Sequence, residues 1–475
     1  MIEQTGSAAD RRRLESTIKR RGFLSSCGVG LGSIALASLL ADDAGAAAGV
    51  PHFAARAKHV IYLHMIGAPS HLDLFDPKPE LVKRHNEPCP PEVTKGRDFA
   101  FIGKTSTLAG SPYQFSQQGE CGHWMSELWP HLSTVADDLA FIHSLHSEEI
   151  NHAPAQMFLH SGFGRGGRPS FGSWVSYGLG SNNADLPGYV VLLSGPAGGA
   201  GTSMWSSGFL PSIYQGIQFR SQGDPVLFLS SPPERSSEQR RQELDALQEL
   251  NLQHFQATGD PEIETRIGQY EMAFRMQASV PELMHINDES AETLSMYGAE
   301  PGKASFANNC LLARRLVERG VRLVELYDSD WDHHGNLETR LPKKCSETDQ
   351  PIAALIKDLK QRGLLKDTLI IWASEFGRTP LMQGGAKGDK VSGRDHHKDA
   401  FTCWLAGGGV QGGTTIGKTD DFGMDVIENP VHIHDLNATV LHLLGIDHER
   451  LTYRYQGREF RLTDVHGHVV RDILS

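Results

Sequence analysis

Short, nearly continuous apolar runs recur along this chain, and they limit it to one broad fold class. They lie at residues 58–65, 138–144, 188–193, 321–327, 368–373 and 401–406. Such runs are typical of strands that are buried on both faces of a parallel sheet. Segments with helical spacing lie between them, at 152–159, 306–319, 349–362 and 435–444. The alternation predicts an α/β fold, with a mostly parallel central sheet and helices on both of its faces.

One stretch, residues 230–300, departs from this alternation because it is long, charged and helical in its spacing. Leu244, Leu247 and Leu250 recur in it at helical intervals. We interpret the stretch as a helical insertion packed against the side of the sheet. The length of 475 residues suits one large domain or two ordinary ones. We expect one domain over 49–475 that carries this insertion.

Residues 1–48 have the composition of an export signal. An arginine pair, Arg20-Arg21, precedes Phe23-Leu24, and a weakly apolar, glycine-containing stretch runs from Cys27 to Ala41. Small residues follow at 44–48, and the whole segment resembles a twin-arginine export signal. We therefore expect a folded, exported protein, periplasmic or extracellular. The alternative is an uncleaved membrane anchor, but the apolar run falls short of the roughly 20 residues that a stable membrane span needs.

The net charge limits the classes of partner, and the cysteine spacing limits the possible disulfides. A formal net charge of −12 argues against nucleic acid or an anionic membrane as the main partner. An anionic substrate is still compatible with it, because a bound metal would offset the charge locally. Of the six cysteines, five lie beyond the export segment, widely spaced and without Cys-x-x-Cys. A disulfide such as Cys89–Cys121 is permitted in an exported protein but not required.

Two clusters each combine a carboxylate with two imidazoles: Asp332-His333-His334 and Asp395-His396-His397. Carboxylate and imidazole are the usual ligands of zinc or manganese in proteins. Both clusters stand in loop-like sequence beside strand-like runs. Ligands of an open parallel sheet bind at the carboxyl ends of its strands. We therefore interpret the two clusters as parts of one metal site.

Neighbouring histidines are not expected to ligate together, because adjacent side chains of an extended chain point in opposite directions. In the first cluster we favour Asp332 with His334 as ligands and place His333 behind them, in a supporting position. In the second cluster, one of His396 and His397 is expected to be a ligand, and the sequence leaves open which.

Polar residues after two other apolar runs are expected at the same edge of the sheet. Asp73 follows run 58–65 and Glu375 follows run 368–373. Both are candidate metal ligands, although Asp73 could instead cap a turn and Glu375 could pair with Arg378. Lys398 could neutralise an anionic substrate or simply be solvated. Three residues are assigned to supporting or substrate contacts: His71, Asp395 and Lys398.

Six phrases resemble a known family. They are Gly67–Asp73, Asn151–Gln156, Trp331–Gly335, Ser374–Pro380, Gly393–His397 and Phe460–Gly467. Their order resembles the alkaline phosphatase and sulfatase superfamily, and more closely the bacterial family called domain of unknown function 1501, often labelled sulfatase-like. The phrases span nearly the whole chain beyond the export segment. The resemblance implies an alkaline phosphatase-like fold, one or two divalent metal ions (zinc, manganese or calcium) and an anionic small-molecule or glycan ester as substrate.

The chain departs from the sulfatase pattern at the nucleophile. A sulfatase carries Cys-x-Pro-x-Arg or its serine equivalent at a helix start, and that residue matures to formylglycine. Here the register reads His152-Ala-Pro-Ala-Gln156, so no formylglycine can form. A literal Ser-x-Pro-x-Arg at 231–235 lies in the polar insertion, not at a strand–helix junction, and we discount it. The superfamily's Asp-His pair is Glu375-Phe376 here, so a second metal would depend on Asp73 and Glu375.

Several functions agree with these residues. The first is a metal-dependent hydrolase of sulfate or phosphate esters, with His152, Asn151 and Arg378 assigned to catalysis. In it His152, at a helix N-terminus, acts as nucleophile, general acid or base, or further metal ligand, and Arg378 or Lys398 binds the anion. The alternative is a non-catalytic relative that keeps the metal and binds anionic glycans at the cell envelope. In a third interpretation the histidines are buried and hydrogen-bonded, and no metal is bound.

Overall fold

Each apolar run of the sequence forms a strand, with ends within about two residues of the prediction. The structure is a computed structural model that describes residues 50–475, apart from 98, 104–105, 221–222, 227–228, 230–234 and 385–390. The strands are β1 (His59–Met65), β4 (Leu139–His146), β5 (Tyr189–Ser194), β7 (Leu323–Asp328), β8 (Thr368–Ala373) and β11 (Phe401–Ala406). The predicted export segment and residues 231–234 of the discounted motif lie outside the described residues.

The strands form one mixed, mostly parallel sheet, as predicted. The order is β12-β4-β11-β8-β1-β7-β5-β6, and β15 also pairs with β4. Short strands occupy the borders: β6 (Ile217–Phe219), β12 (Thr415–Ile416) and β15 (Val431–His432). In the centre, β1 pairs in parallel with β7 and β8. β11 runs antiparallel to both of its neighbours, β4 and β8. The carboxyl ends of β1, β7 and β8 therefore meet at one edge.

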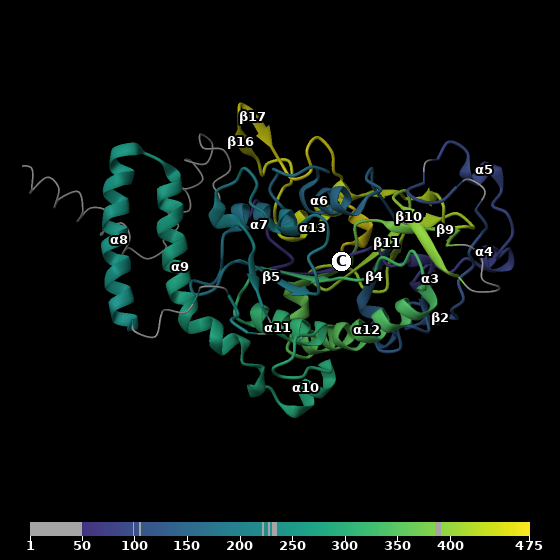
Figure 1. The fold of residues 1–475 in the computed structure, drawn as a ribbon, viewed down its shortest axis with the longest axis horizontal. Helices are drawn as coiled ribbons and strands as arrows, with labels where there is room; N and C mark the ends of the chain where they lie inside the picture. The colour runs from purple at the N-terminus through teal and green to yellow at the C-terminus, as the bar shows by residue number, and fades with distance from the viewer. Residues whose placement is uncertain are drawn as a thin grey trace, which may run out of the picture. The chain divides into compact units, whose positions relative to one another are not determined.

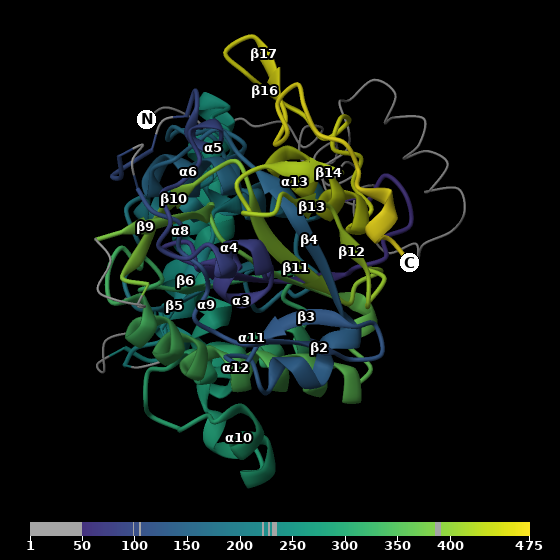
Figure 2. The same ribbon diagram turned by 90° about the vertical axis from the view of Figure 1, so that its right-hand side faces the viewer.

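Helices cover both faces of the sheet (Figures 1 and 2). On one face lie α11 (Phe306–Glu318) and α12 (Leu337–Gln361); on the other lie α6 (His152–Ser161), α7 (Phe171–Leu179) and α13 (Ile433–Leu443). Side chains of β1 alternate between the two cores. Ile61, Leu63 and Met65 share a core with α11 and α12, whereas Val60 and Tyr62 share the other with α6, α7 and α13. The α/β class predicted from the sequence is thus confirmed.

The stretch 230–300 is helical, as predicted. It contains α8 (Ser237–Thr258), α9 (Pro261–Met284) and α10 (Ala291–Tyr297). Figure 1 shows α8 and α9 running side by side as a hairpin. The Ser236 side chain and the Gln239 side chain form a capping box that starts α8. Buried Met276, Val280 and Leu283 of α9 join the core of the sheet face that α11 covers.

Two boundaries differ from the sequence prediction. The helix predicted to begin at 349 begins at Leu337, because buried Leu341 and Cys345 continue its apolar face past Pro342. The segment around Asp395 was expected to be a loop but forms β10 (Gly393–His397), which pairs antiparallel with β9 (Gly377–Gln383). Backbone pairing to β9 supplies the hydrogen bonds that an isolated polar loop would take from water.

Smaller elements complete the chain. The remaining paired strands are β2 (Phe115–Gln118), β3 (His123–Ser126), β13 (Lys418–Thr419), β14 (Val426–Glu428), β16 (Tyr453–Tyr455) and β17 (Arg458–Phe460). The short α-helices are α3 (His71–Leu74), α4 (Pro79–Lys83) and α5 (Pro91–Thr94). The 3-10 helices are η1 (Leu132–Asp138), η2 (Gly201–Trp205), η3 (Ser212–Tyr214), η4 (Ile286–Asp288), η5 (Leu365–Asp367) and η6 (Arg471–Ile473).

The described residues include five cysteines, and all of them are free. Cys89 and Cys121 are both free, so the permitted disulfide between them is not formed. Over the part of the chain that the structure describes, no helix combines the length and apolar character of a membrane span.

Candidate metal centre

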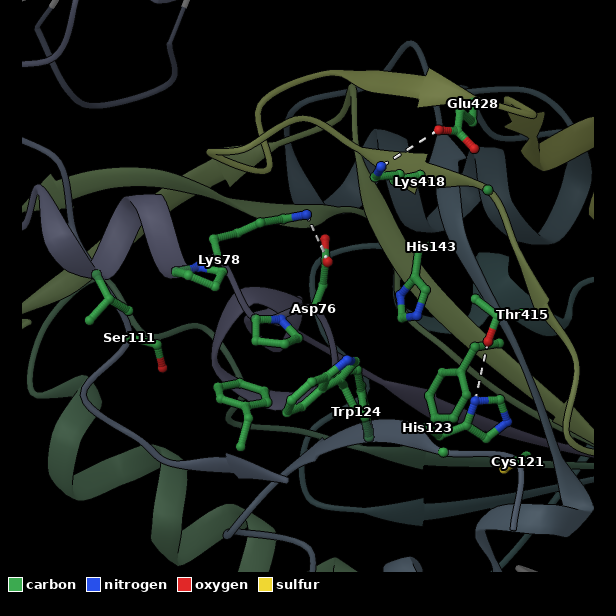
Figure 3. A pocket seen from close by; sticks show the side chains of 18 of the residues that line it. Asp76, Lys78, Ser111, Cys121, His123, Trp124, His143, Thr415, Lys418 and Glu428 are labelled. Carbon is green, nitrogen blue, oxygen red and sulfur yellow. Dashed lines mark hydrogen bonds and ion pairs between the residues drawn. The ribbon is translucent and has the colours of Figure 1, made fainter. Parts of the chain in front are cut away.

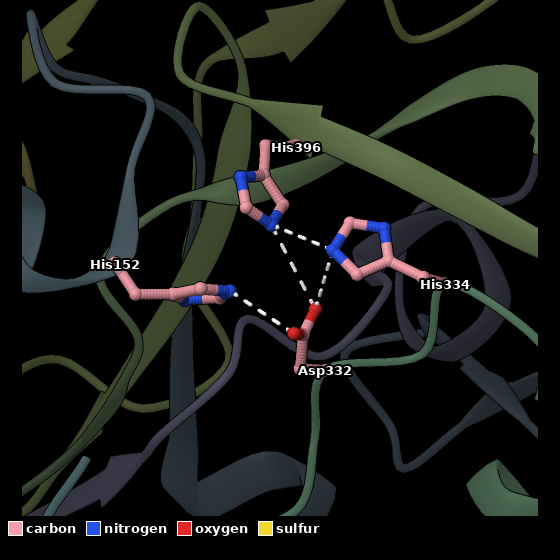
Figure 4. Close-up of side chains that lie close together, drawn as sticks. All are labelled: His152, Asp332, His334 and His396. Atoms are coloured by element: carbon pink, nitrogen blue, oxygen red, sulfur yellow. Dashed lines mark hydrogen bonds and ion pairs between the residues drawn. The ribbon is translucent and has the colours of Figure 1, made fainter. Parts of the chain in front are cut away.

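Four side chains from distant parts of the sequence meet at the carboxyl edge of the sheet. Asp332 and His334 follow β7, His396 lies on β10, and His152 is the first residue of α6. Their ligand atoms all lie within 4.8 Å of one another. Among the described residues, these four form the one group of His, Cys, Asp and Glu side chains that is close enough to share a cation. Figure 4 shows the three imidazoles turned toward the carboxylate.

Asp332 is the centre of the group. Its Oδ1 lies 2.9 Å from Nε2 of His334 and 3.7 Å from Nε2 of His396. Its Oδ2 lies 3.4 Å from Nε2 of His152. The Nε2 atoms of His334 and His396 are themselves only 2.9 Å apart. All three rings therefore direct the same nitrogen, Nε2, toward one point.

The other ring nitrogen of each histidine is held by an oxygen. Nδ1 of His152 donates to Oε1 of Glu375 at 2.7 Å, and Nδ1 of His396 donates to the carbonyl of Ile150 at 2.8 Å. Nδ1 of His334 lies 2.6 Å from Oε1 of Gln383. A hydrogen bond of this kind fixes the tautomer and orientation of metal-ligating histidines.

This arrangement fits a divalent cation. When Nδ1 carries the proton, each neutral imidazole presents a lone pair at Nε2. Three lone pairs and a carboxylate oxygen then face one another, which is repulsive unless positive charge lies among them. Three nitrogens and one oxygen are a donor set suited to zinc or manganese. Asp332, His334 and one histidine of the second cluster, which were predicted to group, lie together in this geometry with His152, for which a ligand role was one of the alternatives.

Electrostatics strengthen the pairing between His152 and its carboxylates. Burial lowers the pKa of His152, but hydrogen bonds to Asp332 and Glu375 outweigh it and raise that pKa to about 9, so a cation that binds at Nε2 must displace a proton from it. Burial acts against ionisation of Glu375, yet His152 and His64 hold its pKa well below the ordinary value. Burial also lowers the pKa of His396. The site therefore attracts positive charge to its His152 side.

Local backbone geometry decides which histidine of each pair faces the centre. His396 is directed to the group, whereas Nε2 of His397 bonds to the carbonyl of Met424 at 2.8 Å. On a strand, successive side chains leave on opposite sides. In the first cluster His334 reaches the group, while His333 is buried with neither ring nitrogen hydrogen-bonded. The predicted choice of His334 over His333 agrees with this placement.

Two glycines let the backbones approach closely at the centre. A Cβ on Gly67 would stand 2.5 Å from the amide nitrogen of Asp332, and the φ of Gly67 is +110°. A Cβ on Gly393 would stand 2.2 Å from the carbonyl carbon and oxygen of His334. Only a residue without a side chain fits at either position. These contacts bring β1, β10 and the loop after β7 together.

Glu375 lies behind His152 and is fully buried. Its Oε1 accepts hydrogen bonds from the amide of Gly67 at 3.0 Å and from Nε2 of Gln156 at 3.1 Å, in addition to His152. Its Oε2 accepts from the hydroxyl of Ser374 at 2.7 Å. With these partners Glu375 orients His152 and stays outside the group of four.

A buried polar chain continues from Glu375 into the core between the sheet and α6. Nε2 of His64 lies 3.4 Å from Oε2 of Glu375, and Nε2 of His160 lies 3.3 Å from Nδ1 of His64. Nδ1 of His160 lies 3.6 Å from Oε1 of Glu325. Two hydroxyls donate to Oε2 of Glu325, those of Tyr189 at 2.6 Å and Tyr327 at 2.5 Å. The support of the centre thus extends through the interior.

Sequence comparison places the chain in a family. A match to the family described as "Protein of unknown function (DUF1501)" covers residues 57–474. The chain is a member of the DUF1501 family. This confirms the family resemblance predicted from the six phrases. A comparison with curated proteins found no match.

Solved structures resemble this DUF1501 protein at low sequence identity. "Ps i-CgsB in complex with k-i-k-neocarrahexaose" is 10% identical and has a TM-score of 0.36, with 82% of this chain and 72% of that chain covered. PsFucS1 sulfatase from Pseudoalteromonas sp. is 13% identical, with a TM-score of 0.34 and coverages of 83% and 69%. Alkaline phosphatase from the Antarctic bacterium TAB5 is 10% identical, with a TM-score of 0.33 and coverages of 74% and 92%. At these scores the likeness carries no function over to this chain.

The structure does not bring Asp73 into the metal group. Asp73 is fully buried and paired with Arg394, whose Nε lies 2.7 Å from Oδ2. A second nitrogen of Arg394 lies 3.0 Å from Oδ1, so both carboxylate oxygens are used. Glu375 is likewise taken up by the donors described above. The oxygen-rich second metal site predicted from these two residues is therefore not assembled here.

Arg378 and Lys398 differ in how well they could reach a substrate. Arg378 is buried, and its guanidinium donates to the carbonyl of Ala68 at 2.8 Å and to Oδ1 of Asp332 at 2.5 Å. It therefore positions the Asp332 carboxylate. Lys398 is partly exposed and pairs with Asp399 at 2.7 Å. Its predicted contact with an anion stays a prediction.

The other predicted residues lie around the centre. Asn151 is exposed and precedes α6 without a side-chain cap bond. His71 is buried, and neither of its ring nitrogens has a hydrogen-bond partner. Asp395 is buried and accepts from the amides of Phe101 and Ile102. None of these three belongs to the group of four.

Sequence reasoning missed several residues that shape the centre. Gln383 was not singled out, because no local pattern marks a glutamine as the partner of a histidine. Gln156 was named only for its place in the sulfatase register, and its bond to Glu375 was not predicted. His64 and Glu325 carried a usable signal, because each is ionisable and stands inside an apolar strand. Ionisable groups on buried strands are expected to be paired.

A separate cavity of about 880 Å³, shown in Figure 3, is lined by none of the four residues of the metal group. Asp76, Lys78, Trp124 and His143 are among its lining residues. Its charged side chains already pair, as Lys78 with Asp76 at 2.8 Å. The cavity was not predicted from the sequence.

Proposed function

We propose that this protein is a metal-dependent hydrolase of phosphate or sulfate esters. The observation that carries the proposal is the convergence of three Nε2 atoms and one carboxylate, each imidazole being fixed at its Nδ1. The centre is open to solvent, since the Asp332 side chain is 41% exposed and those of His334 and His152 are 27% and 24% exposed. Solvent access leaves room for a substrate, as catalytic metal sites require.

The chain's own residues determine what the centre accepts. Asp332, His334, His396 and His152 would hold the cation, which would supply Lewis-acid chemistry by polarising an ester oxygen and acidifying a water molecule. Glu375 keeps the proton of His152 on Nδ1, so that its Nε2 lone pair stays directed to the centre. Arg378 fixes one oxygen of Asp332. In this proposal His152 is a metal ligand, not a nucleophile.

Charge and helix geometry favour an anionic substrate. Asp332 and Glu375 contribute two negative charges near a divalent cation, and buried Arg378 adds one positive charge. The buried carboxylate of Asp395 beside His396 brings the sum of these charges to zero, so the cation itself would attract the anion. The centre also lies at the N-terminus of α6, where the helix dipole stabilises anions. A phosphate or sulfate ester of a small molecule or glycan satisfies both conditions.

The test compares two adjacent histidines. Purified protein is stripped with a chelator and reloaded with zinc, manganese or calcium, and hydrolysis of 4-nitrophenyl phosphate and sulfate is followed. We expect one ion per chain by elemental analysis and turnover that depends on it. His396→Ala should weaken metal binding by about 10- to 100-fold or more and lose turnover. His397→Gln, the matched control whose ring faces Met424, should keep both. No turnover of either ester with any of the metals would overturn the proposal.

A non-catalytic function has one observation in its favour. His152 occupies the helix start where a sulfatase has its nucleophile, so no side chain of this chain replaces formylglycine there. In this second candidate the protein would bind anionic glycans through the same metal. Tight metal-dependent binding of a sulfated oligosaccharide without its hydrolysis would establish it.

A further inference from the structure

An aromatic side chain that the sequence did not single out stands beside the metal group. Phe101 is 62% exposed. Its ring centre lies 4.9 Å from that of His334 and 5.3 Å from that of His396, with interplanar angles of 82° and 84°. Phe101 thus touches two of the four residues of the centre while most of its surface faces solvent.

A buried carboxylate fixes the backbone of Phe101. Oδ2 of Asp395 accepts from the amide of Phe101 at 2.9 Å and from that of Ile102 at 3.1 Å. Its Oδ1 accepts from the amide of His396 at 2.8 Å. One carboxylate therefore ties the backbones of Phe101 and His396 together, and the edge-to-face contacts with His334 and His396 hold the ring beside the centre. Asp395 was predicted to support the site, and this is how it is placed to do so.

Arg97 holds the preceding part of the same segment. Its guanidinium pairs with Asp399 at 3.2 Å and with Asp425. Its Nε donates to the carbonyl of Val93 at 3.0 Å. Asp399 follows β10 by two residues, so both tethers of the segment reach β10 or the turn after it. A ring held in this way loses little freedom when a ligand covers it, which favours binding.

We propose that Phe101 receives the alcohol part of the substrate and that this alcohol carries a ring. The inference rests on the proposed function, because the anionic group of the ester would bind at the metal centre. A rigid, exposed aromatic face attracts the flat face of an aryl group or the C–H face of a sugar. Such a wall favours ring-bearing esters over those of small acyclic alcohols. Phe101 is then a specificity-determining residue and Asp395 a positioning residue.

The experiment measures binding of phosphonates, which cannot be hydrolysed. Calorimetry on the metal-loaded protein compares methylphosphonate with phenylphosphonate and with a C-glucosyl phosphonate. We expect at least one ring-bearing ligand to bind about tenfold more tightly than methylphosphonate. Phe101→Ala should remove this preference and leave methylphosphonate affinity unchanged, whereas Phe101→Tyr should keep it. The ring that is preferred identifies the alcohol as aryl or sugar.

Two further variants separate the possible outcomes. Trp124→Ala, at the half-exposed aromatic of the cavity in Figure 3, is the matched control and should keep the preference. Asp395→Asn, measured at full metal loading, should reduce the preference, because one amide oxygen cannot hold both segments. Equal affinity for all three ligands, or an unchanged preference in Phe101→Ala, would overturn the inference alone. Absence of binding by all three ligands would overturn the proposed function as well.

Discussion

At the scale of single residues, the centre depends on what lies behind each ligand. Glu375, Gln383 and the carbonyl of Ile150 each occupy the Nδ1 of one histidine. A histidine without such a partner could rotate or change tautomer, and its Nε2 would no longer be reserved for a cation. The adjacent histidines His396 and His397 therefore have different surroundings: the ring of His396 faces the centre, and that of His397 bonds to the carbonyl of Met424.

The burial of His71 is expected to make the stability of the folded protein depend on pH. Burial lowers the pKa of His71 to about 3, against 6.5 for a free histidine. Between these values the unfolded chain binds a proton that the folded chain does not, so stability is lost as pH falls below 6.5. At pH 5 the loss from this residue is about 2 kcal/mol. His71→Leu should reduce the stability difference between pH 7 and pH 5 by this amount.

Urea unfolding at the two pH values measures this difference. His254→Gln, on the exposed face of α8, is the control and should leave the pH dependence as it is in the unmodified protein. If His71→Leu loses as much stability on acidification as the unmodified protein, His71 is not the group responsible.

At the scale of elements, the centre forms because β10 packs directly on the loop after β7. The contact is between backbones, at Gly393 and His334. The pairing of β10 with β9 fixes the position of His396, and the start of α6 fixes the position of His152. The buried chain through His64 and His160 joins α6 to the sheet beneath the centre. Displacement of any one element would separate ligand atoms.

Gly393→Ala tests this packing. The new Cβ would meet the His334 backbone at 2.2 Å, so β10 must move outward and carry His396 with it. We expect metal affinity to fall about 10- to 100-fold, measured by competition with a chromophoric chelator. Gly335→Ala is the matched control, since its Cβ meets nothing within 4 Å. Equal affinity in the two variants would contradict the role given to this contact.

At the scale of the whole molecule, the predicted export segment and the metal centre belong to one hypothesis. Twin-arginine export carries folded proteins, so the centre could be loaded before export. Replacing Arg20 and Arg21 by lysine should retain the protein in the cytoplasm, because the signal is read through its arginine pair. Cell fractionation with detection of the protein measures this. The same change at Arg12 and Arg13 is the control and should leave export intact; periplasmic protein in the first variant would refute the assignment.

The architecture could be predicted well because it depends on local patterns. Six apolar runs specify six strands, and the segments between them specify helices of the two flanking layers. The extension of α12 to Leu337 was missed because prolines interrupt the pattern while burial continues through them. β10 was missed because its polar sequence has no strand pattern, and its pairing with β9 is a tertiary interaction.

The sequence by itself determined the fold class, the family and the chemical character of the centre. Carboxylate and imidazole at strand ends were sufficient to predict that Asp332 and His334 lie together in a candidate metal site. Only the tertiary structure placed His152, and His396 instead of His397, in the group of four, and paired Asp73 with Arg394. It also placed Phe101 beside the ligands. The physical reason is that composition and period act over a few residues, whereas a ligand set depends on contacts between segments as distant as His152 and His396.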